Sequence, residues 1–66
     1  MKNTLKIERD LKKITQEELA SNTGVSRQTI ISIESGKFIP STLLSLKIAR
    51  VLQKRVDELF WLEEYD

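Results

Sequence analysis

Apolar residues recur along this sequence at intervals of three and four positions, the spacing that gathers them on one face of an α-helix. This period continues through the whole chain and predicts five short helices with almost no strand. A chain of 66 residues has room for one domain. We therefore expect an all-α fold in a single domain, residues 1–66.

The first two helices are expected over roughly Thr4–Lys13 and Thr15–Asn22. Asn3 is the expected N-cap of the first helix. Thr15 and Glu18 form a capping box, in which each side chain accepts a hydrogen bond from a free backbone N–H group at the helix start. The first helix and the residues after it carry the apolar set Leu5, Ile7, Leu11 and Ile14.

Three more helices are expected in the rest of the chain. Ser26 is positioned to cap the third helix, and Gly36 to end it. Lys37–Pro40 is a short loop, and a fourth helix follows over Ser41–Leu52 with the serine as its cap. A fifth, poorly capped helix is expected over Val56–Phe60. The fourth helix should form the floor of the core through Leu43, Leu44, Leu46, Ile48, Ala49, Val51 and Leu52.

Residues 16–35 carry the pattern that matters for function. Two helices joined by about four residues must cross steeply, with their backbones close together. Ala20 is small enough for the crossing, and Gly24 accepts the positive φ of a tight turn. The residues expected to face inward are Leu19, Val25, Ile30 and Ile33. Together these features predict a helix-turn-helix unit, with a plain helical hairpin inside a bundle as the alternative.

The composition excludes more classes of protein and site than the net charge does. The formal net charge is only +1, so an ordinary mixed surface explains it as well as nucleic-acid binding does. The chain has no cysteine and no histidine, which excludes disulfides and zinc held by thiolate or imidazole. The commonest general base and the thiol nucleophile are missing, so we expect no enzyme, no cofactor and no metal. No apolar run suggests a membrane span or a secretory signal, so a cytoplasmic protein is expected.

Six short stretches of the sequence carry a family pattern: Gln16–Ala20, Gly24–Ile30, Ile33–Gly36, Pro40–Ser41, Leu46–Ala49 and Asp57–Phe60. They resemble the Cro/Xre family of phage and bacterial repressors, most closely its short single-domain members. The resemblance covers nearly the whole chain. It implies a compact five-helix, lambda-repressor-like DNA-binding domain, with the helix-turn-helix in its second and third helices. In short members of the family the two chain ends can also pair as a small β-sheet.

The resemblance implies that the third helix enters the DNA major groove with its first residues against base edges. The core positions then leave Arg27, Gln28 and Ser32 pointing outward as base contacts, with Ser26, Thr29 and Ile31 at the edges. Arg27 suits O6 and N7 of guanine, and Gln28 suits N6 and N7 of adenine. A phosphate contact is the main alternative for Arg27. Ile31 is unusual at an outward position, where a thymine methyl contact and plain tolerated exposure are equally good explanations.

A second group of polar residues is expected at DNA phosphates: Gln16, Ser26, Thr29, Ser35 and Lys37. Gln16 lies in the first turn of the second helix, where free N–H groups favour an anion, and the family uses this glutamine to hold the DNA backbone. For Thr29 a structural role is nearly as good an explanation. Lys12 and Lys13 lie near the same edge, with simple solvation as the alternative.

Members of the family join the positions of Arg9 and Glu34 by a partly buried ion pair that ties the first helix to the third. We expect this pair to be structural, because a buried charge that loses its partner is costly. Two independent surface charges are the alternative.

A homodimer is expected because one small domain reads only a few base pairs. Two copies would read a near-palindromic operator with half-sites about one turn apart. The candidate interface is apolar material beyond the core, namely Phe60, Trp61 and Leu62, with Tyr65 and exposed residues of the last two helices. Trp61 has two alternative positions, folded back onto the core or, with Leu62, paired with Lys2 as a strand.

The expected function is sequence-specific binding of double-stranded DNA to regulate transcription, in most family members as a repressor. Neither a membrane nor a small-molecule ligand is expected as a partner. Two alternatives stay open: an antitoxin that represses its own operon, and a protein-interaction module that has abandoned DNA. The polar residues Arg27, Gln28 and Ser32 argue against the second.

Overall fold

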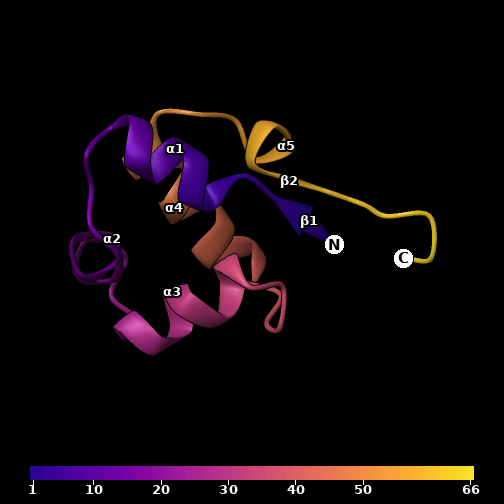
Figure 1. Cartoon of the computed structure of the whole chain (residues 1–66), viewed down its shortest axis with the longest axis horizontal. Coiled ribbons are helices and arrows are strands. Elements are labelled where there is room, and N and C mark those ends of the chain that lie inside the picture. Colours follow the sequence, from indigo (N-terminus) through magenta and orange to yellow (C-terminus); the bar gives the residue numbers. More distant parts are fainter.

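The computed structural model describes all 66 residues as five helices and a small two-stranded sheet (Figure 1). The helices are α1 (Leu5–Leu11), α2 (Gln16–Thr23), α3 (Arg27–Glu34), α4 (Thr42–Leu52) and α5 (Val56–Leu59). The strands are β1 (Lys2–Asn3) and β2 (Phe60–Trp61). The predicted all-α, five-helix fold is confirmed, together with a β pairing of the chain ends.

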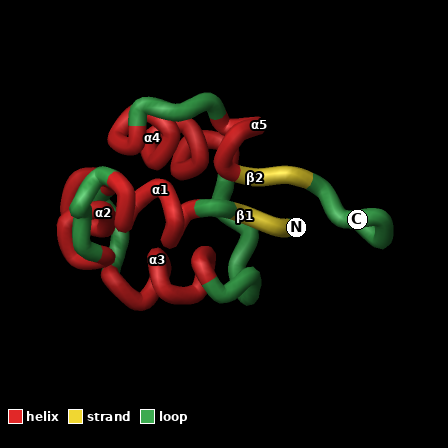
Figure 2. The backbone as a smooth tube through the Cα atoms, turned by 45° about the horizontal axis from the view of Figure 1, so that its top comes forward, coloured by secondary structure: helices red, strands yellow, loops and turns green.

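The helices surround one apolar interior. Figure 2 shows α4 and α5 on one side of the molecule, α3 on the other, and α1 between them. The two termini lie together at the end away from α2. The larger buried cluster consists of Leu5, Ile33, Leu44, Ile48, Ala49, Leu52, Leu59 and Phe60, and a smaller one of Leu19, Ala20 and Ile30. Ile14 and Val25 pack against both clusters and join them.

Local hydrogen bonds explain where three of the helices begin. The Glu18 backbone N–H donates to the Thr15 hydroxyl at 3.0 Å, and the Thr15 backbone N–H donates to the Glu18 carboxylate at 3.0 Å. Ser26 and Ser41 each accept the backbone N–H three residues further on, at 3.2 and 3.1 Å. Each bond satisfies one of the free N–H groups at a helix start. The three predicted caps are therefore confirmed.

The first helix is shorter than predicted. Thr4 occupies the N-cap position, and Asn3, one residue earlier, accepts the Leu5 backbone N–H at 3.1 Å through its side-chain oxygen. At the other end the helix stops at Leu11 because Lys13 adopts a left-handed backbone with φ of 57°. A left-handed residue cannot continue a right-handed helix.

Phe60 corrects two expectations about the end of the chain. It does not end α5 but begins β2, where Asn3 is its partner and Lys2 lies opposite Trp61. Its side chain is only 6% exposed and belongs to the core. The prediction that Phe60 lies beyond the core was therefore wrong, and the predicted pairing of Lys2 with Trp61 is present without Leu62.

Several apolar residues of the predicted helices are exposed. In α4, Leu44, Ile48 and Leu52 follow each other at intervals of four and face the core. Leu43 and Leu46 lie on the other side of the same helix and are exposed, so they are not part of the core floor as predicted. No helix is both long enough and apolar enough to cross a membrane.

The capping box makes stability depend on pH. The backbone N–H of Thr15, and secondly its side chain, hold the pKa of Glu18 below its ordinary value of 4.5. Such a carboxylate stabilises the folded state above its unfolded pKa, and the contribution is lost as pH falls through the folded pKa. The free energy of unfolding of the natural chain should therefore fall relative to Glu18→Gln as the pH drops from neutral to well below 4.5. Denaturant titrations across this range measure the difference, and two parallel pH profiles would contradict it.

Candidate nucleic-acid interface

The turn between α2 and α3 is fixed by backbone geometry and buried contacts. Gly24 has φ of 76° and ends α2, and the next N–H, of Val25, donates to the Ala20 carbonyl at 3.1 Å. A side chain at Gly24 would meet no atom within 4 Å, so the positive φ rather than space calls for glycine. Thr23 is buried and donates its hydroxyl to the Leu19 carbonyl at 2.7 Å. These bonds close the end of α2, and the packing of Ile30 with Leu19 and Ala20 seats α3 against it.

The outward face of α3 carries the three predicted base-contacting residues. Ile30 and Ile33 are buried on the opposite face, which leaves Arg27 and Gln28 exposed. Ser32 is half-buried, and the Gln28 side-chain nitrogen lies 3.4 Å from its hydroxyl. Glutamine and arginine side chains with free polar groups can reach base edges in a major groove.

Ser26 and Thr29 share a hydrogen-bonded arrangement at the start of α3. The Ser26 hydroxyl accepts the Thr29 backbone N–H at 3.2 Å and lies 3.0 Å from the Thr29 hydroxyl. One hydroxyl hydrogen bridges the two side chains, which leaves the other for a further acceptor. Of these two predicted phosphate contacts, Ser26 is also the N-cap of α3, and Thr29 is the residue whose backbone N–H it caps.

Two further predicted phosphate contacts, Ser35 and Lys37, lie at or just after the end of α3. Lys37 is exposed, and its backbone N–H donates to the Ser32 carbonyl at 2.9 Å. Ser35 donates its hydroxyl to the same carbonyl at 3.1 Å and lines a hollow of about 380 Å³ together with Glu63. Basic Lys2 and acidic Glu63 both line this hollow, so it has no clear charge preference, whereas Lys37 brings an exposed positive charge and is the better placed of the two for a DNA backbone.

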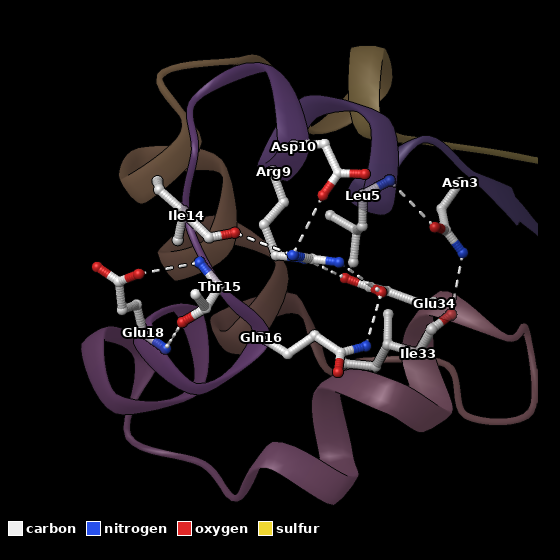
Figure 3. Close-up of polar contacts among 10 residues, drawn as sticks. All are labelled: Asn3, Leu5, Arg9, Asp10, Ile14, Thr15, Gln16, Glu18, Ile33 and Glu34. Atoms are coloured by element: carbon white, nitrogen blue, oxygen red, sulfur yellow. Dashed lines mark hydrogen bonds and ion pairs between the residues drawn. The ribbon is translucent and has the colours of Figure 1, made fainter.

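A polar cluster centred on Glu34 joins α1, α2 and α3 (Figure 3). The Arg9 guanidinium donates to the Glu34 carboxylate at 2.8 Å, and a second guanidinium nitrogen donates to the Ile14 carbonyl at 2.9 Å. The two charged side chains are only 9% and 8% exposed. The hydrogen bond to Glu34 raises the pKa of Arg9 above its ordinary value despite its burial. Arg9 and Glu34 therefore form a buried ion pair, as the resemblance implied, rather than two separate surface charges.

Gln16 belongs to the same cluster, which the sequence did not indicate. Its side-chain nitrogen donates to the Glu34 carboxylate at 3.1 Å, so Glu34 fixes the orientation of the amide group (Figure 3). An amide nitrogen has two hydrogens, and the second is left for a phosphate. Gln16 is half-buried in the first turn of α2, at the position predicted for a backbone contact.

Phe38 is the residue of this face that the sequence analysis missed. It lines a hollow of about 180 Å³ with Gln28, Thr29 and Ser32. The available signal was an aromatic residue in the loop directly after Lys37, one position beyond the predicted contacts. The structure thus brings three predicted DNA contacts together around an aromatic side chain.

Comparison with known families agrees with this geometry. The family model described as Helix-turn-helix matches residues 5–59, which include all five helices. The chain therefore belongs to the Cro/Xre type of this helix-turn-helix family, a family of DNA-binding transcriptional regulators.

Individual relatives are similar over most of their length. An uncharacterized HTH-type transcriptional regulator of Methanocaldococcus jannaschii is 50% identical over 64 residues, 97% of either chain. Another, YgzD of Bacillus subtilis, is 44% identical over 64 residues, again 97% of either chain. Among solved structures, the restriction-modification controller protein C.AhdI from Aeromonas hydrophila superimposes with a TM-score of 0.78 at 34% identity, covering 85% of each chain.

The ion pair leads to a stability prediction. Glu34→Ala would leave the buried Arg9 charge with only the exposed Asp10 carboxylate, 3.4 Å away, and should lower the free energy of unfolding by up to about 3–5 kcal/mol. Glu34→Gln keeps an acceptor for Arg9 and Gln16 and should cost less. Replacing both charges, as Arg9→Met with Glu34→Leu, should also cost less than Glu34→Ala because no charge is left unpaired. Denaturant unfolding of the variants decides this, and a Glu34→Ala protein as stable as the natural chain would refute a structural ion pair.

Proposed function

We propose that this chain binds a near-palindromic site in double-stranded DNA as a homodimer and represses transcription by occupying a promoter. In this proposal residues 1–66 act as one domain, with α3 in the major groove. The single observation that carries it is the outward face of α3, which exposes Gln28 and an Arg27 that forms no ion pair within the protein.

The charge on the outward side of α3 favours a negatively charged partner, as DNA is. Glu34 is the only acidic residue of the helix, and it is turned inward and neutralised by Arg9. The outward side is therefore left with the positive charge of Arg27, and Lys37 follows just after the helix. A face without negative charge meets phosphates without repulsion.

Base reading is assigned to Arg27, Gln28 and Ser32. A bidentate contact from Arg27 to guanine or from Gln28 to adenine discriminates between bases by roughly 1–3 kcal/mol. The phosphate contacts are Gln16, Ser26, Thr29 and Lys37, with Ser35 the least favourably placed. Gln16 supplies its second amide hydrogen while Glu34 holds the first.

Exposed apolar surface supports the homodimer. Two hollows of about 440 and 280 Å³ share Met1, Val56 and Phe60, so they form one apolar area between α4 and β2. Trp61 and Leu62 line the first of these hollows and are exposed. A contiguous apolar area rimmed by polar residues, here Arg55 and Asp57, is a candidate protein–protein interface. The interface of the proposal is this area, with Phe60 as its buried floor.

The proposed DNA target also decides where the protein acts. A transcriptional regulator acts where the DNA is, so we place the protein in the cytoplasm. The proposal includes no catalytic step, no small-molecule ligand and no membrane partner.

Selection from a randomised duplex library tests the DNA site. The expected result is a near-palindromic motif with half-sites about one turn apart. Gln28→Ala should relax one position of each half-site, whereas Gln16→Ala should weaken binding to all sequences alike, because it removes a phosphate contact. Failure to retain any motif at low salt would overturn the proposed function.

A matched pair of leucines tests the dimer. Leu62 and Leu11 are both 73% exposed, but only Leu62 lines the proposed interface. Leu62→Glu should convert the dimer to a monomer in analytical ultracentrifugation, because a charge buried between two copies is costly. Leu11→Glu should leave the dimer intact. Equal behaviour of the two variants would place the interface elsewhere.

A further inference from the structure

We propose that Phe38 is a base-reading residue and that the hollow it forms with Gln28, Thr29 and Ser32 takes the C5-methyl group of a thymine. This inference rests on the proposed DNA binding and adds to it the identity of a contacted base. It assigns a role to an aromatic side chain that the fold itself does not use.

The position of Phe38 is fixed beside the outward face of α3. The backbone N–H groups of Lys37 and Phe38 both donate to the Ser32 carbonyl, at 2.9 and 3.2 Å. These two bonds hold the loop against the end of α3. The Phe38 side chain is 47% exposed and belongs to neither core cluster.

The lining of the hollow is suited to an A·T base pair. Phe38 is its one hydrophobic lining residue, and the others are Gln28, Thr29 and Ser32. In the major groove adenine offers N6 and N7, which suit a glutamine, and thymine offers the only apolar group, its methyl. A base pair read by Gln28 through its adenine therefore brings a methyl group towards Phe38.

The size of the hollow is compatible with this occupant. Its volume of about 180 Å³ is several times the ~30 Å³ that a group of water size occupies. A methyl group enters with room for part of the thymine ring edge. Gln28, Thr29 and Ser32 carry donors that suit a phosphate as well, but the Phe38 ring carries none, so a direct role for Phe38 points to the methyl group.

Exposure alone does not distinguish Phe38, as the neighbouring Ile39 shows. It follows Phe38 directly and is more exposed, but it lines the hollow of the proposed dimer interface and not that of α3. Single exposed apolar residues are common on proteins. What distinguishes Phe38 is that it shares a hollow with two predicted base contacts, Gln28 and Ser32.

Replacing thymine by deoxyuridine removes only the methyl group and so tests the contact directly. Each thymine of one half-site in the selected duplex is replaced in turn, and binding is measured by fluorescence anisotropy. For the natural chain, one replacement should weaken binding about four-fold, the effect of losing one buried methyl-sized group. Phe38→Ala should bind both duplexes equally, and Phe38→Leu should retain part of the difference. Leu11→Ala, at an exposed residue that lines neither this hollow nor the proposed dimer interface, should keep the full four-fold effect.

The outcomes separate this inference from the proposed function. A selected motif in which no deoxyuridine weakens binding overturns the methyl contact alone. A methyl effect of unchanged size in Phe38→Ala assigns the contact to another residue and also overturns it. If the natural chain selects no motif, the proposed function fails first and this inference fails with it. Thermal unfolding of Phe38→Ala, expected to match the natural chain because the ring is outside the core, excludes misfolding as the cause.

Discussion

The carboxylate of Glu34 is the point at which three helices are joined. It belongs to α3, accepts from Arg9 of α1 and from Gln16 of α2, and is nearly excluded from water. Arg9 also donates to the Ile14 carbonyl, in the segment between α1 and α2. A buried charge without its partner is costly, so these segments must take their places together. Ile30 and Ile33 of the apolar clusters set which side of α3 faces inward, and the Glu34 contact ties that side to α1 and α2.

The same contact prepares the binding face. Turning Glu34 inward removes the only negative charge of α3 from the outside, and fixing the Gln16 amide aims its remaining hydrogen away from Glu34. Ser26 caps α3 and is hydrogen-bonded to the Thr29 hydroxyl, and both side chains are candidate phosphate donors. Side chains already held in place lose little conformational freedom on binding. The structural bonds of α2 and α3 therefore also organise the surface that the proposed function needs.

What could be predicted from the sequence was mostly local. Thr15, Ser26 and Ser41 cap helices through bonds to residues three positions away, so their pattern was visible in the chain. Lys13 was not predictable, because nothing in its neighbours calls for a positive φ. Phe60 was placed outside the core because the pairing of β1 with β2, which seats it there, joins opposite ends of the chain.

On the binding face, too, local features could be predicted and contacts between elements could not. Arg27 and Gln28 followed from the helical period once Ile30 and Ile33 were assigned to the core. The bond from Gln16 to Glu34 and the place of Phe38 beside Gln28 depend on how α2, α3 and the following loop pack. No local pattern contains that information.

The central claim is that DNA binds to the outward face of α3. The most direct test records the backbone amide ¹H–¹⁵N shifts of the labelled protein while a duplex carrying the selected motif is added. The account predicts the largest shift changes along α3, in the first turn of α2 and at Lys37 and Phe38. Changes concentrated on α1 or on the acidic end of the chain, with α3 unaffected, would contradict it.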